Sequence, residues 1–154
     1  MKHRKVSQGI VLLTVAVIVV LAATWHSHAR ARLHALRLIG KRGGTFEFVN
    51  KAENADSIPN DLDLGSARQQ IAVIDLGGAD VSPSDVILIL DALREVKVLS
   101  LINTPVDDSV VPSILELENP TELHFEGSMV TSDGVVSTRR RFPQAHVFEF
   151  HVVP

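Results

Sequence analysis

Two histidines and several glutamates in the C-terminal third are the residues best suited to chemistry. His124 and Glu126 form one pair, and Glu149 and His151 form another, each with a spacing of two residues. An imidazole beside a carboxylate is able to bind a divalent metal, to exchange protons, or simply to pair on a wet surface. If the two segments are adjacent strands in register, His124 lies beside Glu149 and Glu126 beside His151, about 4.8 Å apart.

We interpret this cluster as surface pairing, because exposed ligands without supporting groups around them rarely hold a metal well. The chain has no cysteine, which excludes disulfides, thiolate zinc sites and a cysteine nucleophile. It also lacks a G-x-S-x-G or H-E-x-x-H motif and a phosphate-binding glycine loop. We therefore predict no catalytic, cofactor-binding or metal-binding residues, and a metal-dependent hydrolase is the least favoured function.

The segments that carry these residues belong to a repeat. Each segment places two large apolar residues two positions apart, as a strand with one buried face requires. Their starts are 25, 24 and 25 residues apart. The four segments are Val73-Ile74-Asp75-Leu76, Val98-Leu99-Ser100-Leu101, Glu122-Leu123-His124-Phe125 and Val147-Phe148-Glu149-Phe150.

The residues that follow the first three segments also recur. A small or hydroxyl residue comes first (Ala79, Thr104, Ser128), then a valine (Val81, Val106, Val130), and then a residue suited to cap a helix (Ser82, Asp107, Thr131). Apolar residues at helical spacing then predict helices over residues 85–96, 109–117 and 132–142.

These motifs resemble the leucine-rich repeat in its L-x-L-x-x-T-x-V-T-D form, over about residues 70–151. The resemblance implies an α/β solenoid of about three strand–helix turns plus a final strand. It also implies that the Thr104 and Ser128 side chains bond between turns, whereas Ala79 departs from the pattern. The segment from Ala35 to Phe48 is similar to the entry of short membrane-anchored bacterial proteins of this family, with Phe46-Glu47-Phe48 as a strand that closes the core. An ordinary open α/β sheet is the alternative fold.

In such a solenoid the residues between the buried positions project from one face, where a ligand would bind. The predicted columns on this face are Val73, Val98, Glu122 and Val147, then Asp75, Ser100, His124 and Glu149, then Gly77, Ile102, Glu126 and His151. From these columns the predicted interaction face takes eight residues: Val98, Ser100, Ile102, Glu122, His124, Glu126, Glu149 and His151.

The front of the chain has a different character. Residues 1–42 carry eight Lys or Arg and no acid, while the remainder carries all eighteen acids. The run from Val6 to Trp25 is long and apolar enough to predict a single transmembrane helix. A cleaved signal peptide is the alternative, and it would leave a secreted or periplasmic protein. The side of the bilayer on which the repeats lie is left open.

The predicted organisation is a basic tail over residues 1–5, a transmembrane helix over 6–25 and a basic amphipathic helix over 26–44. A cap strand with a polar loop follows over 45–69, and the repeat domain covers 70–154. We expect a non-catalytic interaction module on the bacterial cytoplasmic membrane, bound to another protein or an envelope component. A structural or degenerate repeat protein without a dedicated ligand is the alternative. The acidic domain argues against nucleic acid as a partner.

Overall fold

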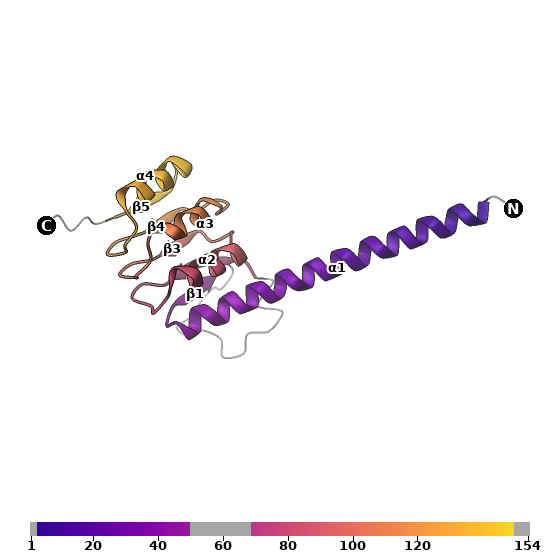
Figure 1. The fold of residues 1–154 in the computed structure, drawn as a ribbon, viewed down its shortest axis with the longest axis horizontal. Coiled ribbons are helices and arrows are strands. Elements are labelled where there is room, and N and C mark those ends of the chain that lie inside the picture. Colours follow the sequence, from indigo (N-terminus) through magenta and orange to yellow (C-terminus); the bar gives the residue numbers. More distant parts are fainter. Residues whose placement is uncertain (1–2, 50–68, 150–154) are drawn as a thin grey trace.

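The computed structural model describes residues 3–49 and 69–149, with side chains from residue 17 onward (Figure 1). It is a mixed α/β structure with one five-stranded sheet. In chain order its elements are α1 (His3–Lys41), β1 (Thr45–Phe48), β2 (Ile71–Asp75), α2 (Pro83–Ala92), β3 (Val98–Ser100), the short 3-10 helix η2 (Asp108–Val110), α3 (Val111–Leu115), β4 (Glu122–His124), α4 (Ser132–Arg141) and β5 (His146–Phe148).

The sheet follows the order of the chain. Its strand order is β1-β2-β3-β4-β5, and β2 to β5 are parallel. The register aligns Val73, Val98, Glu122 and His146, so successive turns span 25, 24 and 24 residues. β2, β3 and β4 are thus each followed by a helical segment that returns the chain to the neighbouring strand, and the turns stack on one another (Figure 1).

The first turn is covered by an antiparallel strand. β1 pairs with β2, with Phe46 opposite Ile74, and the buried Phe46 side chain joins the core. Gly44 precedes β1 and approaches β2 closely, because a Cβ at this position would lie 2.6 Å from the Leu76 side chain and 2.9 Å from the Asp75 carbonyl oxygen. The predicted cap strand over Phe46-Glu47-Phe48 is therefore present.

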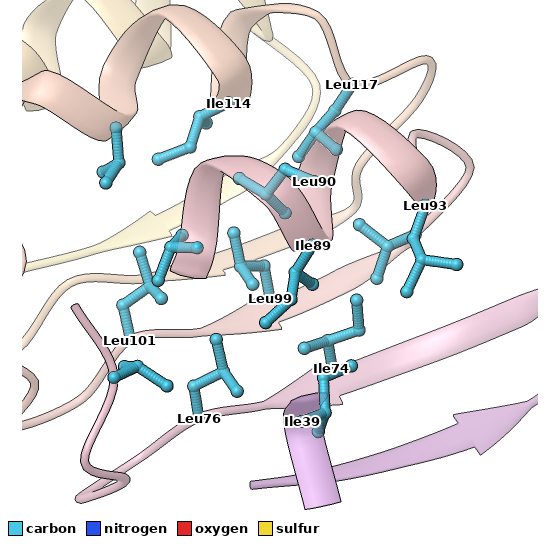
Figure 2. Packing of buried hydrophobic residues seen from close by; sticks show 14 of the residues in the cluster. Ile39, Ile74, Leu76, Ile89, Leu90, Leu93, Leu99, Leu101, Ile114 and Leu117 are labelled. Atoms are coloured by element: carbon cyan, nitrogen blue, oxygen red, sulfur yellow. The ribbon is translucent and has the colours of Figure 1, made fainter. Parts of the chain in front are cut away.

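The core is a layer of aliphatic side chains between the sheet and the helices (Figure 2). Each of the first three parallel strands contributes two buried residues at alternate positions, which are Ile74 and Leu76, Leu99 and Leu101, and Leu123 and Phe125. Figure 2 shows Ile89, Leu90 and Leu93 of the α2 segment above this layer, with Ile114 and Leu117 from the next turn beside them. Burial of such side chains is the main stabilising term of the fold.

The predicted capping residues begin the helical segments. Ser82 caps α2 through a capping box with Asp85, Asp107 caps η2, and Thr131 caps α4. The Ser82 backbone N–H donates to the Asp85 carboxylate and lowers the pKa of Asp85, and Arg42 lowers it further from 2.9 Å away. The hydroxyl and backbone N–H of Ser109 likewise lower the pKa of Asp107.

The turn hydroxyls bond within their own turns. Thr104 Oγ1 donates to the Leu101 carbonyl oxygen at 2.7 Å, and Ser128 Oγ donates to the Phe125 carbonyl oxygen at 2.7 Å. We expected these two side chains to bond between turns, but each of them bonds within its own turn instead. Ala79 has no hydroxyl at the equivalent position. The turn is closed there by its backbone N–H, which donates to the Leu76 carbonyl oxygen at 2.9 Å.

A side-chain bond between turns comes instead from Asp108. Its carboxylate accepts from the Thr131 backbone N–H at 2.8 Å and from Thr131 Oγ1 at 2.6 Å. The same carboxylate packs against the Cα of Gly134 in α4, where a Cβ would lie 2.6 Å from Asp108 Oδ1. Asp108 therefore connects the start of η2 to the start of α4.

The predicted transmembrane helix over residues 6–25 is wrong. Within the described residues, no helix is long and apolar enough to cross a membrane. Among the described side chains, the apolar stretch of α1 runs from Val17 to Trp25, and the helix then continues through Arg30, Arg32 and Arg37 to Lys41. α1 begins at His3, inside the predicted basic tail over residues 1–5.

The C-terminal part of α1 belongs to the core of the domain. Leu36 and Ile39 are fully buried, whereas Arg30, His34, Arg37 and Lys41 are exposed, so the predicted amphipathic pattern is present. In this part of the helix, α1 packs against α2 and β1 (Figure 1).

Two arginines fix α1 to the first turn. Arg32 is buried, lies 2.5 Å from the Glu95 carboxylate and donates to the Gln69 carbonyl oxygen. Arg42, directly after α1, pairs with Asp85 at the start of α2. These contacts make residues 29–42 the N-terminal cover of the stacked turns.

The helical segments differ from prediction in their bounds. α2 begins at Pro83 and ends at Ala92, four residues before the predicted end, because the chain then turns to bring the Lys97 N–H to the Ala72 carbonyl oxygen. The predicted helix over 109–117 is split into η2 and α3, with Pro112 in the first turn of α3. The predicted polar loop over residues 50–68 lies outside the described residues.

Candidate functional site

Two rows of outward-facing side chains cross the sheet on the side away from the helices. They alternate with the buried positions, as successive side chains of a strand do. One row consists of Glu47, Val73, Val98, Glu122 and His146, and the other of Thr45, Asp75, Ser100, His124 and Phe148. Ile102 and Glu126 continue the alternation beyond β3 and β4. We call these twelve residues the strand face.

His124 is the centre of this face. Its Nε2 lies 3.4 Å from Glu122 Oε2 and its Nδ1 lies 3.6 Å from Glu126 Oε1, so two carboxylates of its own segment hold the imidazole from both sides. The ring stacks on Phe148 with 4.5 Å between centroids and 7° between planes. A stacked pair of this kind contributes about 0.5–1.5 kcal/mol beyond its burial. The imidazole is thereby fixed in orientation.

Glu126 is the most buried carboxylate of the strand face. Its side chain is 15% exposed, and its Oε2 has no hydrogen-bond partner among the described residues. The only charged or titratable contact of its other oxygen in this part of the chain is His124 at 3.6 Å. A buried carboxylate oxygen without a donor is unfavourable, and a donor brought by a ligand would relieve this.

Phe148 is the largest exposed apolar group of the strand face, with 42% of its surface accessible. It occupies the row of Ser100 and His124, where we predicted Glu149. The prediction that His124 lies beside Glu149 is therefore wrong. The last turn has 24 residues rather than 25, and this shifts β5 by one position, so that His146 takes the place predicted for Val147.

Glu149 lies on the other side of the sheet. It follows Phe148 at the position where the earlier turns place Leu76, Leu101 and Phe125, and it is 2.7 Å from Arg139 of α4. Arg139 also donates to the Val147 carbonyl oxygen. Because β5 is the last strand of the sheet, Glu149 has fewer apolar neighbours than the equivalent residues of the earlier turns. An ion pair with Arg139 can therefore replace apolar packing at this position. Glu149 is thus removed from the predicted interaction face.

The remaining predicted residues are distributed unevenly. Val98, Ile102, Glu122, His124 and Glu126 are half-buried on the strand face, whereas Ser100 is 8% exposed. His151 lies outside the described residues, and so does its predicted pairing with Glu126. The strand face also contains Val73 and Asp75, which the predicted columns included but the eight-residue interaction face did not. It further contains four residues that the prediction omitted, which are Thr45, Glu47, His146 and Phe148. The 24-residue spacing from Glu122 to His146 was a sequence signal for the last two.

The chemistry of this face suits binding. Ser100 lies beside His124 in register, but the contacts of the imidazole with described side chains are with Glu122, Glu126 and Phe148. Over residues 17–49 and 69–149, no group of three acidic or imidazole side chains is placed to hold a metal ion. An open sheet face exposes its reacting groups to water, which weakens the electrostatic stabilisation of a transition state.

A second surface lies on the helical side. A groove of about 490 Å³ runs between α1 and α2. Its lining consists of His28, Ala31, His34, Ile87, Leu88, Asp91 and Ala92. This groove offers mainly apolar contacts and is the alternative location for binding a partner.

No protein-family model, curated protein or solved structure matches this chain.

Proposed function

We propose that this protein is a non-catalytic interaction module of the leucine-rich-repeat kind, which binds another protein through its strand face. The stacking of one parallel strand per turn supports the family resemblance, together with the recurring caps Ser82, Asp107 and Thr131. Extended faces made by such stacked strands are used for binding in repeat proteins. Fold alone does not define a partner, so the argument depends on the side chains of the face.

The observation that carries the proposal is the exposed Phe148 ring, stacked on His124 on a side of the sheet that no described element covers. Half-buried Val98 and Ile102 extend the apolar area along the neighbouring strand. Interfaces commonly centre on such an aromatic anchor, with polar groups around it. Glu122, Glu126 and His146 are the polar groups in this case.

Site-specific photo-crosslinking in cells of the native host tests this proposal. A photoreactive phenylalanine analogue replaces Val98 on the strand face in one variant and Leu88 on α2 in the matched control. We expect a discrete crosslinked protein from position 98, and its loss when Ile102→Arg and His124→Arg are added. Circular dichroism and urea unfolding confirm that the added substitutions leave the fold intact.

Crosslinking from position 88 alone would move the binding surface to the helical side and contradict the proposal. Crosslinking from neither position would favour a structural repeat protein without a dedicated ligand.

A further inference from the structure

We propose that the partner segment bound by the strand face is cationic, with Lys or Arg side chains flanking an apolar or aromatic one. This inference rests on the proposed function and deepens it by stating the chemistry of the partner. Three observations support it. They are the distribution of charge over the two sides of the sheet, the apolar groups near the carboxylates, and the lack of a hydrogen-bond donor to Glu126 Oε2 among the described residues.

The strand face carries carboxylates and no permanent positive charge. Glu47, Asp75, Glu122 and Glu126 belong to it, and none of its twelve positions is Lys or Arg. Asp75 is partly satisfied by the Gly77 N–H at 2.8 Å. Negative charges gathered on one face make the local electrostatic potential more negative, which attracts cations and repels phosphate backbones.

The bases lie on the other side of the molecule. Among residues with described side chains, every Lys and Arg is on α1 or α4, or in the segments that directly follow α1 and α2. Four of them pair there with carboxylates, as Arg32 with Glu95, Arg42 with Asp85, Arg94 with Glu116 and Arg139 with Glu149. In this part of the chain, no Lys or Arg forms an ion pair with a carboxylate of the strand face.

The apolar groups of the face lie between these carboxylates. Val98 pairs in register with Glu122, and the Ile102–Asn103 segment lies beside Glu126 through the bond from the Asn103 N–H to the Glu126 carbonyl oxygen. Phe148 is beside His124, which itself contacts both glutamates. Because His124 covers one face of the Phe148 ring, a Lys or Arg side chain of the partner would approach at the edge of the stacked pair, where Glu122 and Glu126 contact the imidazole.

Glu126 supplies an independent argument for a cation donor. Its carboxylate is mostly buried, yet one oxygen has no hydrogen bond among the described residues and the other has only the 3.6 Å contact with His124. An acidic partner would be repelled by this carboxylate, and a neutral donor would satisfy its oxygen without balancing its charge. A Lys or Arg at the edge of His124 would donate to it, and hydrogen bonds between charged groups are the stronger class.

Peptide selection is the first test. Random dodecapeptides displayed on phage are selected on the immobilised full chain and counter-selected on the Ile102→Arg/His124→Arg variant. We expect enrichment of sequences in which Lys or Arg flank Leu, Phe or Trp. Enrichment of neutral or acidic peptides, or no enrichment, would overturn the inference.

The second test measures the affinity of one enriched synthetic peptide by calorimetry. Glu122→Gln/Glu126→Gln keeps the shape of the face and is expected to weaken binding on the order of fivefold, with a smaller salt dependence. Asp91→Asn/Glu116→Gln removes the same number of charges from the helical side and should leave the affinity unchanged. Equal effects of the two double variants would contradict a specific role of the strand face carboxylates.

The outcomes separate this inference from the function on which it rests. If Ile102→Arg/His124→Arg abolishes binding but Glu122→Gln/Glu126→Gln does not change the affinity, the strand face remains the binding surface. The proposal that the partner is cationic is then refuted. If counter-selection on the Ile102→Arg/His124→Arg variant removes every peptide that the wild type retains, the peptides bind elsewhere and the strand face itself is refuted.

Discussion

The Asp85 carboxylate stabilises the start of α2 through several contacts. It accepts from the Ser82 N–H at 3.0 Å and from Ser82 Oγ at 2.8 Å, and it pairs with Arg42 at 2.9 Å. The same residue therefore completes a capping box and connects α2 to the end of α1. These contacts favour the ionised form and account for its lowered pKa.

Asp85→Asn should lower the free energy of unfolding by about 1–2 kcal/mol near neutral pH. Because the folded pKa of Asp85 lies below 3.8, its contribution is complete above about that pH and is lost as the pH falls through the folded pKa. Urea unfolding at about pH 7 and about pH 2.5 should show the gap between wild type and variant closing in acid. Asp91→Asn is the control, and a gap that does not change with pH would contradict this account.

Gly134 shows two opposing effects at one position. Alanine in a helix is favoured over glycine by about 0.5–1 kcal/mol, but a Cβ at this position would lie 2.6 Å from Asp108 Oδ1 and about 3 Å from the methyls of Val130 and Val111. Asp108 is held by Thr131 and moves only by breaking those bonds. Overpacking costs about 1–3 kcal/mol, so steric cost outweighs helix propensity.

Gly134→Ala should therefore destabilise the protein by about 1–2 kcal/mol in thermal or urea unfolding. Val136→Ala, on the exposed side of the same helix, should be nearly neutral. In a double-mutant cycle, Asp108→Ala should remove part of the cost of Gly134→Ala. Strict additivity of the two changes would show that the Cβ does not meet the carboxylate.

At the scale of elements, α1 carries two kinds of surface. Its exposed side chains between Val17 and Trp25 are mostly apolar, whereas its last turns bury Leu36 and Ile39 against the first turn. A reading based on hydropathy alone is dominated by the apolar run over residues 6–25 and predicts an anchor that is separate from the folded domain. The docking of residues 29–42 depends on Arg32 meeting Glu95 and Arg42 meeting Asp85, which are long-range pairings that no local pattern reveals.

Leu36→Ala tests whether this docking belongs to the core. Loss of a fully buried leucine should cost about 2–5 kcal/mol, whereas Leu88→Ala on exposed α2 surface should cost well under about 1 kcal/mol. Thermal unfolding followed by circular dichroism compares the two variants. Small and equal losses would mean that α1 contributes little to the folded domain.

Local chemistry made some elements predictable. Side chains such as Ser82 and Thr131 act on amides three residues away, and the alternation of Ile74 with Leu76 or Leu99 with Leu101 marks the buried side of each strand. The last strand was predicted wrongly, because the segment from Val147 to Phe150 repeats the apolar pattern of the first two segments, whereas the structure pairs His146 with Glu122. Its register is decided by the ladder to β4 and by the Arg139–Glu149 pair, and these are tertiary interactions.

At the scale of the whole molecule, the stacked turns and the C-terminal part of α1 share one core. The cluster of buried residues runs from Ala35 in α1 to Phe142 after α4. Each turn is too small to bury its own aliphatic side chains without a neighbour, so stability depends on the interfaces between turns. Because the stack has few turns, unfolding of one turn should expose the apolar side chains of its neighbour to water.

Hydrogen exchange should therefore show one opening free energy at both ends of the stack. Amides of α1 near Leu36 and the Phe125 amide, which donates to the Phe148 carbonyl oxygen beside β5, should exchange through the same global unfolding. The measurement is native-state exchange with increasing denaturant, read by mass spectrometry or NMR. Exchange of the α1 amides at a much lower free energy would indicate an independently unfolding helix.

Chemical-shift mapping by NMR locates the binding surface residue by residue. The labelled full chain is titrated with an enriched cationic peptide, and binding to the strand face should perturb the amides of residues 98–102, 122–126 and 146–148. Perturbations confined to residues 28–34 and 87–92 would place binding in the groove between α1 and α2 and contradict binding to the strand face.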